Sequence, residues 1–228
     1  MIPLLLTRPT ARSERFFTQL DADVRAGLKP VFAPMWRMEQ GQDAPDFDVA
    51  LFTSANGVHF GPEAAGRTAY CIGAATADKA RAAGWKVIAS GQDADALVET
   101  ILKVRPTGRL MHVGGARTRG AVAERLAAAG LNAERHVAYV QHPLPLSVEA
   151  RDILAKGNVI VPLFSPDGAA HFVKQAGRKT DVHIAAISHA TALELGDFAA
   201  TSVLVAEDPN AKSMADAVGK LLYALQSG

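Results

Sequence analysis

Residues 51–60 read LFTSANGVHF, and residues 163–172 read LFSPDGAAHF. Both stretches open with Leu-Phe, reach a serine, continue with Asn-Gly or Asp-Gly, and close on His-Phe. In each case an apolar run precedes a serine turn, and a helix-like segment follows it. A chain of 228 residues fits one large domain or two domains of about 110 residues, and the repeat favours two.

Short apolar runs alternate with Ala- and Leu-rich helical stretches along the whole chain. Apolar runs without clean alternation are typical of parallel strands that are covered on both faces. We therefore expect α/β domains with doubly wound, mostly parallel sheets and right-handed crossovers. The predicted strands are 3–7, 49–52, 69–72, 86–89, 110–113, 159–164, 183–187 and 202–206. The predicted helices are 10–21, 76–83, 94–104, 118–129, 166–176, 191–195 and 211–225.

The repeat extends beyond the serine phrase. IGAATA from Ile72 is echoed by ISHATA from Ile187, and the N-terminal LLLTRP segment resembles the segment from Arg109 in layout. In each copy, segment A is a strand, a turn and a helix, segment B holds the serine turn, and segment C holds the Ala-Thr turn. The order A-B-C-A′-B′-C′ predicts two units on one plan.

Two Pro-punctuated extended segments, 29–38 and 135–140, interrupt this rhythm and are candidate interdomain strands. If they pair, near 34–38 and 136–140, the chain crosses between domains twice. Residues 1–33 and 141–228 then form one domain, and residues 34–140 form the other. The alternative is two contiguous repeats divided near Pro106, and the pattern alone does not choose between them.

Composition and motifs exclude several classes of protein. A net charge of +1 with dispersed Lys and Arg lacks the basic footprint of a nucleic-acid binder. One cysteine, Cys71, excludes an intrachain disulfide and a cysteine-based zinc site, and we expect it in a buried strand. No window approaches a membrane span, and the N-terminal MIPLLLTRP has too short an apolar run and no cationic region for a signal peptide, so we expect a cytoplasmic protein. Glycine fingerprints for nucleotides and His-Glu-x-x-His are absent, so no nucleotide cofactor and no metal site of that kind is indicated.

Candidate binding residues lie in the turns that follow the predicted strands. Ligands of open parallel sheets bind beyond the carboxyl ends of the strands, where free N–H groups of helix N-termini attract anions. Each turn by itself is more often a helix cap than a binding site, but several such turns over two domains favour a site for anions. The candidates are Arg8, Ser54, Asn56, Thr76, Gly114, Ser165, Ser188 and Thr191.

Tyr139 is the candidate for chemistry, because it lies in the predicted crossing strand VAYV. A phenol with an ordinary pKa of about 10 is a usable proton donor to a leaving hydroxyl if it is well placed. The alternative is an aromatic strand residue without a catalytic role. Arg8 is open in the same way between an anion contact and a surface ion pair.

The chain as a whole resembles the uroporphyrinogen-III synthase family. The resemblance rests on the order and spacing of several phrases over nearly the whole length. These are LLLTRP (4–9), AGLKPVFAPMWRME (26–39), LFTSANGV (51–58), IGAATADKARAAGW (72–85), VAYV (137–140), LFSPDGAAHF (163–172), ISHATALEL (187–195) and VAEDPNAKSMADAV (205–218).

The resemblance implies two flavodoxin-like, pseudo-duplicated α/β domains joined by a two-stranded β ladder, with the active site in the cleft between them, and so the discontinuous domain arrangement. It implies a lyase of tetrapyrrole biosynthesis, which cyclises hydroxymethylbilane with loss of water and inversion of ring D, without cofactor or metal. Tyr139 matches the tyrosine suggested to assist departure of the hydroxyl. The Ser and Thr candidates and Asn56 match turns that line the cleft, whereas Gly114-Gly115 departs from the expected Arg-Gly.

The resemblance further implies a monomer whose partner is its small-molecule substrate, with at most transient contact to the enzyme that makes the bilane. Two other classes stay open on the residues alone. One is a two-domain protein that binds an anionic metabolite without chemistry. The other is a nucleotide-dependent α/β enzyme, which the absent glycine fingerprints disfavour.

Overall fold

The computed structural model describes residues 1–91, 93–117, 120–177 and 181–227. The chain forms two compact units. Unit 1 comprises Met1–Arg37 and Pro143–Gly228, and unit 2 comprises Met38–His142. The sequence-based boundaries, after residues 33 and 140, lie slightly earlier.

The described part of unit 1 holds a five-stranded sheet in the order β2-β1-β9-β10-β11, and all its pairings are parallel. This is the strand order of a flavodoxin-like fold. The strands are β1 (Ile2–Leu6), β2 (Leu28–Phe32), β9 (Val159–Leu163), β10 (Val182–Ala186) and β11 (Ser202–Val205). The helices are α1 (Thr10–Thr18), α2 (Ala22–Gly27), α7 (Val148–Lys156), α8 (Pro166–Ala176), α9 (His189–Leu193) and α10 (Ala211–Ser227).

The described part of unit 2 holds a six-stranded sheet in the order β3-β8-β7-β4-β5-β6, and the strands from β8 to β6 pair in parallel. The strands are β3 (Trp36–Gln40), β4 (Val49–Phe52), β5 (Thr68–Ile72), β6 (Lys86–Gly91), β7 (Leu110–Gly115) and β8 (Ala133–Pro143). The helices are α3 (Ala55–Phe60), α4 (Ala74–Ala82), α5 (Ala94–Val104) and α6 (Val122–Ala128).

The two sheets share one plan strand by strand. The order β2-β1-β9-β10-β11 in unit 1 corresponds to β8-β7-β4-β5-β6 in unit 2. Segment A of the first copy (β1), together with the following strand β2, therefore lies beside segments B′ and C′ of the second copy (β9, β10). Segment A′ (β7), together with the following strand β8, lies beside segments B and C of the first copy (β4, β5). Each unit is thus built from parts of both copies.

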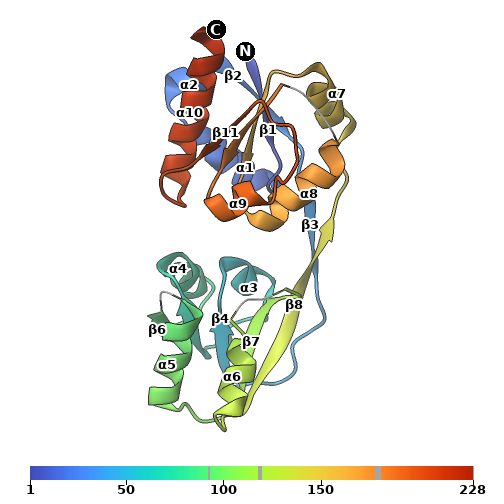
Figure 1. Ribbon diagram of the computed structural model, residues 1–228. Helices are drawn as coiled ribbons and strands as arrows, with labels where there is room; N and C mark the ends of the chain where they lie inside the picture. Colours follow the sequence, from blue (N-terminus) through green and yellow to red (C-terminus); the bar gives the residue numbers. More distant parts are fainter. Residues whose placement is uncertain (92, 118–119, 178–180, 228) are drawn as a thin grey trace. The chain divides into compact units, whose positions relative to one another are not determined.

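Both sheets are covered on two faces (Figure 1). On β1, Leu5 packs in a cluster with α7 and α8, whereas Leu4 and Leu6 pack in a cluster with α1, α2 and α10. In unit 2, Phe52 belongs to the cluster under α3 and α4, and Leu51 to the cluster under α5 and α6. Successive residues of a strand point to opposite faces, so continuous apolar strands build two cores. The predicted doubly wound α/β fold is confirmed.

All eight predicted strands are present, and Cys71 is buried in β5, where burial raises the pKa of its thiol to about 11. Two helices, α2 and α7, were not among the predicted ones, whereas α3 is the helix-like segment expected after the serine turn of residues 51–60. The predicted helix 10–21 ends at Thr18, because Asp21 already begins α2 as its N-cap residue. The predicted helix start at Thr118 lies outside the described residues, and α6 begins at Val122.

The extended segment 29–38, in which a crossing strand was predicted near 34–38, contains parts of two strands. Its first half belongs to β2, which pairs with β1 and is an edge strand of the unit 1 sheet. Pro30 has no backbone N–H to donate, and an edge strand tolerates this because it has a partner strand on one side only. Its second half enters β3, which neighbours β8. The amide of Gly41 donates to the carbonyl of Ala138 (2.8 Å), and that of Leu144 donates to Met35 (2.8 Å), so this pair runs antiparallel. The chain passes between the units within these two strands.

Candidate functional site at the strand ends of unit 2

A hollow of about 450 Å³ lies at the carboxyl ends of the strands of unit 2. We call it the strand-end hollow. It opens between the neighbouring strands β7 and β4. After β7 the chain continues to one face of the sheet, and after β4 it continues to the other face. Open α/β sheets bind ligands at such a point. Its lining residues are Thr53, Ser54, Ile72, Asp93, Ala94, Asp95, Gly115, Arg117, Gly120 and Tyr139.

Tyr139 lines the strand-end hollow from β8 and is only 8% exposed. Its ring packs against Phe60 of α3, with ring centroids 5.2 Å apart. Its backbone carbonyl accepts from the amide of Ala116 (3.0 Å), which ties β8 to the loop after β7. Among the described residues the phenol hydroxyl has no hydrogen-bond partner. The side chain is therefore held by packing at the hollow, while its hydroxyl remains available to a ligand.

The glycine pair at the end of β7 explains how Tyr139 fits. A Cβ on Gly115 would lie 2.7 Å from Cζ of Tyr139, so the phenol ring occupies the space that any side chain at residue 115 would fill. The sequence pointed to Gly114, but Gly115 is the glycine that lines the hollow. Pairing between β7 and β8 shifts register at this point, which the sequence does not reveal.

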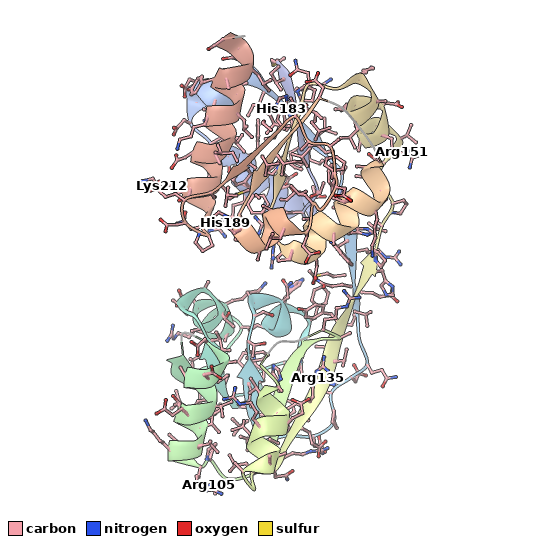
Figure 2. The ribbon with its side chains drawn as sticks, in the orientation of Figure 1. Arg105, Arg135, Arg151, His183, His189 and Lys212 are labelled. Carbon is pink, nitrogen blue, oxygen red and sulfur yellow. The ribbon has the colours of Figure 1, made fainter. Side chains whose placement is uncertain are left out.

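Arg135 fixes the loop that follows β7. From β8 (Figure 2), its Nη2 donates to the carbonyl oxygen of Gly115 (2.7 Å) and also to that of Ala116. A charged donor that holds two carbonyls makes this turn rigid. Arg117, one residue further on, is exposed and lines the hollow, so the loop presents a cation there.

Thr53, Asp93, Asp95 and Arg117 line the hollow but were not among the predicted residues. Asp93 caps α5 by accepting from the amide of Ala96 (2.9 Å), and Asp95 pairs with Arg125 (2.7 Å). A signal for Arg117 was present, because a cation that follows a strand-end glycine pair is a natural contact for an anion. Thr53 directly precedes the serine that was chosen.

Three of the predicted serines are N-cap residues. The hydroxyl oxygen of Ser54 accepts from the amide of Gly57 (3.2 Å), that of Ser165 from Gly168 (3.1 Å), and that of Ser188 from Thr191 (3.3 Å). Capping uses the oxygen as an acceptor and leaves the hydroxyl proton free to donate. Ser54 lines the strand-end hollow of unit 2, whereas Ser165 and Ser188 follow β9 and β10 in unit 1.

The remaining predicted residues differ in exposure. Thr76 is 7% exposed and Thr191 is fully buried, with its hydroxyl 3.1 Å from that of Ser188. Asn56 donates its amide to the Met38 sulfur (3.4 Å). Arg8 follows β1 in unit 1, and its guanidinium lies 4.2 Å from the centre of the Phe164 ring. Burial, and secondarily Arg12, lower the pKa of Arg8 from its ordinary value.

Comparison with known proteins identifies the family. The family model described as uroporphyrinogen-III synthase HemD matches residues 20–216, which is more than half of the chain. This chain belongs to the uroporphyrinogen-III synthase family. No curated protein sequence matches it significantly.

Solved structures of the uroporphyrinogen-III synthase family share the fold. The uroporphyrinogen-III synthetase of Helicobacter pylori superposes with a TM-score of 0.68 at 16% identity, over 97% of this chain and 100% of that one. A mutant uroporphyrinogen III synthase of the extremely thermophilic bacterium Thermus thermophilus gives a TM-score of 0.54 at 18% identity, over 100% of both chains. At these identities the likeness concerns the fold.

His112 is a buried titratable group that contacts the lining of the strand-end hollow in this member of the uroporphyrinogen-III synthase family. It lies on β7, is 1% exposed, and its Nε2 is 3.2 Å from Oγ1 of Thr53. Its Nδ1 is buried without a hydrogen-bond partner among the described residues. Burial, and secondarily the charge of Arg135, lower the pKa of His112 to about 4, against a smaller opposing effect of Glu124. The imidazole is therefore neutral near pH 7.

Acid should destabilise the protein through His112. The unfolded chain binds this proton below about pH 6.5, whereas the folded chain binds it only near pH 4. The free energy of unfolding is therefore unaffected by protonation of His112 above about pH 6.5. As the pH falls toward 4, protonation of His112 in the unfolded chain lowers it by about 3 kcal/mol at most. We expect His112→Gln to show a smaller loss of unfolding free energy between pH 7 and 4.5, measured by urea denaturation. Equal losses in both proteins would contradict the assignment.

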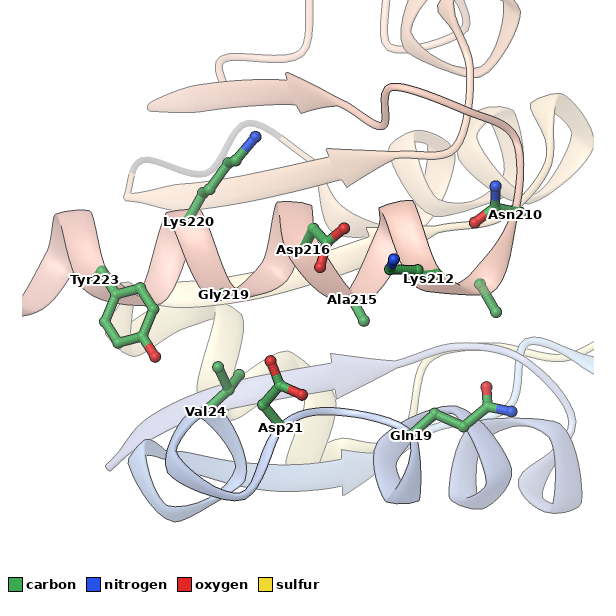
Figure 3. A pocket seen from close by; sticks show the side chains of 11 residues that line it. Gln19, Asp21, Val24, Asn210, Lys212, Ala215, Asp216, Gly219, Lys220 and Tyr223 are labelled. Carbon is green, nitrogen blue, oxygen red and sulfur yellow. The ribbon is translucent and has the colours of Figure 1, made fainter.

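A larger hollow, of about 760 Å³, lies along α10 in unit 1, facing α2 and the α1–α2 turn (Figure 3). Asp21, Asp216, Lys212 and Lys220 contribute charges of both signs to its lining. The hydroxyl of Tyr223 in the same lining donates to Asp23 at one end. This hollow is larger than the strand-end hollow, but it runs beside a helix and its lining mixes acidic and basic side chains. We therefore do not choose the candidate site by volume.

Two further observations concern the part of the chain that the structure describes. No group of three or more His, Cys, Asp or Glu side chains lies close enough to hold a metal ion. No helix there is long and apolar enough to cross a membrane.

Proposed function

We propose that this chain is the cyclising hydro-lyase of the uroporphyrinogen-III synthase family, which converts hydroxymethylbilane to uroporphyrinogen III. Family membership over residues 20–216 carries the proposal. The strand-end hollow supports it, because a phenol, hydroxyl groups and a cation line one recess at the ligand-binding edge of a doubly wound sheet.

The reaction requires departure of one hydroxyl group and correct folding of a flexible chain. In the proposed mechanism Tyr139 transfers its phenol proton to the leaving hydroxyl, which departs as water and leaves an azafulvenium-like cation. Ring D attacks this cation through its substituted carbon to give a spiro intermediate, which fragments, recloses with ring D inverted and loses a proton. The proton that the product loses at ring closure restores the phenol. Pyrrole chemistry supplies the reactivity, so the protein chiefly contributes positioning.

The substrate carries eight carboxylates, yet the protein has a net charge of only +1. We propose that local donors hold these carboxylates instead of a broad basic surface. In unit 2 these donors are the hydroxyls of Thr53 and Ser54 and the guanidinium of Arg117, all of which line the hollow. In unit 1, Ser165, Ser188 and Arg8 follow strands at the corresponding edge. N-terminal N–H groups and hydroxyls bind anions without a large net charge.

Incubation with freshly prepared hydroxymethylbilane, followed by oxidation and separation of the isomers, tests the proposal. We expect the type III isomer in excess over the type I isomer that forms spontaneously. A product that is only type I would remove the proposal. It would leave the alternative, a two-domain protein that binds an anionic metabolite without chemistry.

Replacement of one serine turn should have a small effect on binding. For Ser54→Ala we expect KM for hydroxymethylbilane to rise less than tenfold, because one neutral donor among many is lost. Ser147→Ala is the matched control, since Ser147 caps α7 through the amide of Ala150 (3.1 Å) and does not line the hollow. Both variants should lose about 1 kcal/mol of stability. A rise in KM of more than 100-fold in Ser54→Ala, without such a rise in Ser147→Ala, would contradict the proposal that many donors share the binding.

We further propose that the chain acts as a monomer and meets the enzyme that makes the bilane only transiently. Its large exposed apolar side chains support this, because Ile88, Val104, Val148 and Leu193 lie on four different elements. Light scattering at micromolar concentration should give the mass of one chain, and a concentration-independent dimer would contradict it.

A further inference from the structure

We propose that His112 is a positioning residue that orients the Thr53 hydroxyl, so that its proton points into the strand-end hollow and donates to a carboxylate oxygen of the substrate. The identity of the carboxylate ligand rests on the proposed function. The orientation of the hydroxyl rests on the geometry of unit 2 alone.

Neighbouring strands bring the two residues together. β4 and β7 pair in parallel with Leu51 opposite His112, and Thr53 follows two residues after Leu51. Residues two apart on a strand share a face, so Thr53 and His112 both lie on the face that α5 and α6 cover. Thr53 is half-buried at the end of β4 and lines the hollow, whereas His112 lies beneath it at 1% exposure.

The buried ring can bond Thr53 in one of two tautomers. A neutral imidazole carries one N–H, and His112 is neutral near pH 7 because burial lowers its pKa. If Nδ1 carried the proton, a buried N–H donor would have no partner among the described residues. If Nε2 carries it, only a lone pair is left unpaired, which is the commoner situation for buried groups. We therefore assign the proton to Nε2, which donates to Thr53 Oγ1 over 3.2 Å.

This assignment determines what Thr53 can do. A hydroxyl that accepts from His112 keeps its own proton for another acceptor. The adjacent Ser54 is in the same state, because its oxygen accepts from the amide of Gly57. Two consecutive hydroxyls that line one hollow are thus both set to donate, which suits an ionised carboxylate, an acceptor without donors.

The tautomer can be read directly in the unmodified protein. With ¹⁵N-labelled histidine, two-bond ¹H–¹⁵N spectra at pH 7 should show the His112 ring protonated on Nε2, and Thr53→Val should shift that nitrogen. A ring protonated on Nδ1 or on both nitrogens would overturn the proposal. This readout does not depend on activity, so it decides the orientation even if the chain makes no type III product.

A double-mutant cycle tests whether His112 acts through Thr53. Thr53→Val should raise KM for hydroxymethylbilane, and Kd for the oxidised type III product, by about tenfold. His112→Leu should raise both severalfold with little change in kcat, and His112→Gln, whose amide reaches the Nε2 position, should restore most of the loss. His112→Leu combined with Thr53→Val should add nothing to Thr53→Val alone. Additive losses, or no rescue by Gln, would overturn the proposal.

His183→Leu is the matched control. His183 is the buried strand histidine of the other sheet, 6% exposed, and its Nδ1 lies 2.8 Å from Oγ of Ser202 (Figure 2). It lies near the amino end of β10, away from the strand ends that carry the turns. We expect His183→Leu to lower stability and leave KM and Kd unchanged. A rise in KM equal to that of His112→Leu would show a general structural effect and overturn the proposal.

Discussion

Tyr139→Phe is expected to lower the rate of type III formation about 100-fold while the protein remains folded, since general acid assistance typically contributes at least that much. The phenol ring is held by Phe60 and by the glycine at residue 115, so the phenylalanine ring should keep the same position. Only the hydroxyl, which has no partner among the described residues, is removed. The measurement is the initial rate of type III formation with saturating hydroxymethylbilane.

Tyr70→Phe provides the control for this experiment. Tyr70 is 1% exposed on β5 of the same sheet, and burial raises the pKa of its phenol, but it does not line the strand-end hollow. This variant should keep the rate within about twofold and lose at most about 1–2 kcal/mol of stability. An unchanged rate in Tyr139→Phe would reduce Tyr139 to a packing residue of β8.

The fold followed from local pattern, because doubly covered strands must be continuously apolar and the turns after them must cap helices. The sequence does not show which strands pair with one another. The sequence shows 29–38 as one extended segment, but only the partners, β1 and β8, divide it into two strands. The helix expected after Ser54 is present as α3, but six residues are too few to establish its bounds from a helical period.

The candidate site was predictable at the level of turns and not at the level of contacts. Ser54, chosen among the turns after strands, and Tyr139, chosen from the predicted crossing strand, both line the strand-end hollow. The sequence pointed to Gly114, whereas Gly115 lines the hollow and lies against Tyr139, where pairing between β7 and β8 shifts register. The contact between Thr53 and His112 joins residues far apart in sequence, and no local signal marks it.

The doubled phrase LFTSANGVHF and LFSPDGAAHF has the same capping chemistry in both units but different packing. Ser54 and Ser165 each cap a helix through the glycine three residues later. The His-Phe endings do not superpose, since Phe60 lies six residues after its cap and Phe172 seven. A helix turns by about 100° per residue, so the two rings face different directions. Phe172 is fully buried in the unit 1 core, whereas Phe60 packs on Tyr139.

The glycines of the two phrases differ in the same way, and this gives the second large effect. A Cβ on Gly57 would lie 2.5 Å from the carbonyl oxygen of Val113, so α3 approaches β7 too closely for any side chain. A Cβ on Gly168 would lie 3.0 Å from Oγ of Ser165, a side-chain atom that can move. Gly57 is therefore required by backbone packing, whereas Gly168 is not.

Gly57→Ala should accordingly lower the free energy of unfolding by about 1–3 kcal/mol, because α3 must move away from β7. In thermal unfolding this corresponds to a loss of roughly 2–4 °C per kcal/mol for a chain of this size. The movement also displaces Ser54 and Phe60, so type III formation should fall with stability. Gly168→Ala, the same substitution in the other phrase, should be neutral or stabilising because alanine favours a helix by about 1 kcal/mol. Equal losses in the two variants would show that both glycines serve the turn itself and that the approach of α3 to β7 is not the constraint.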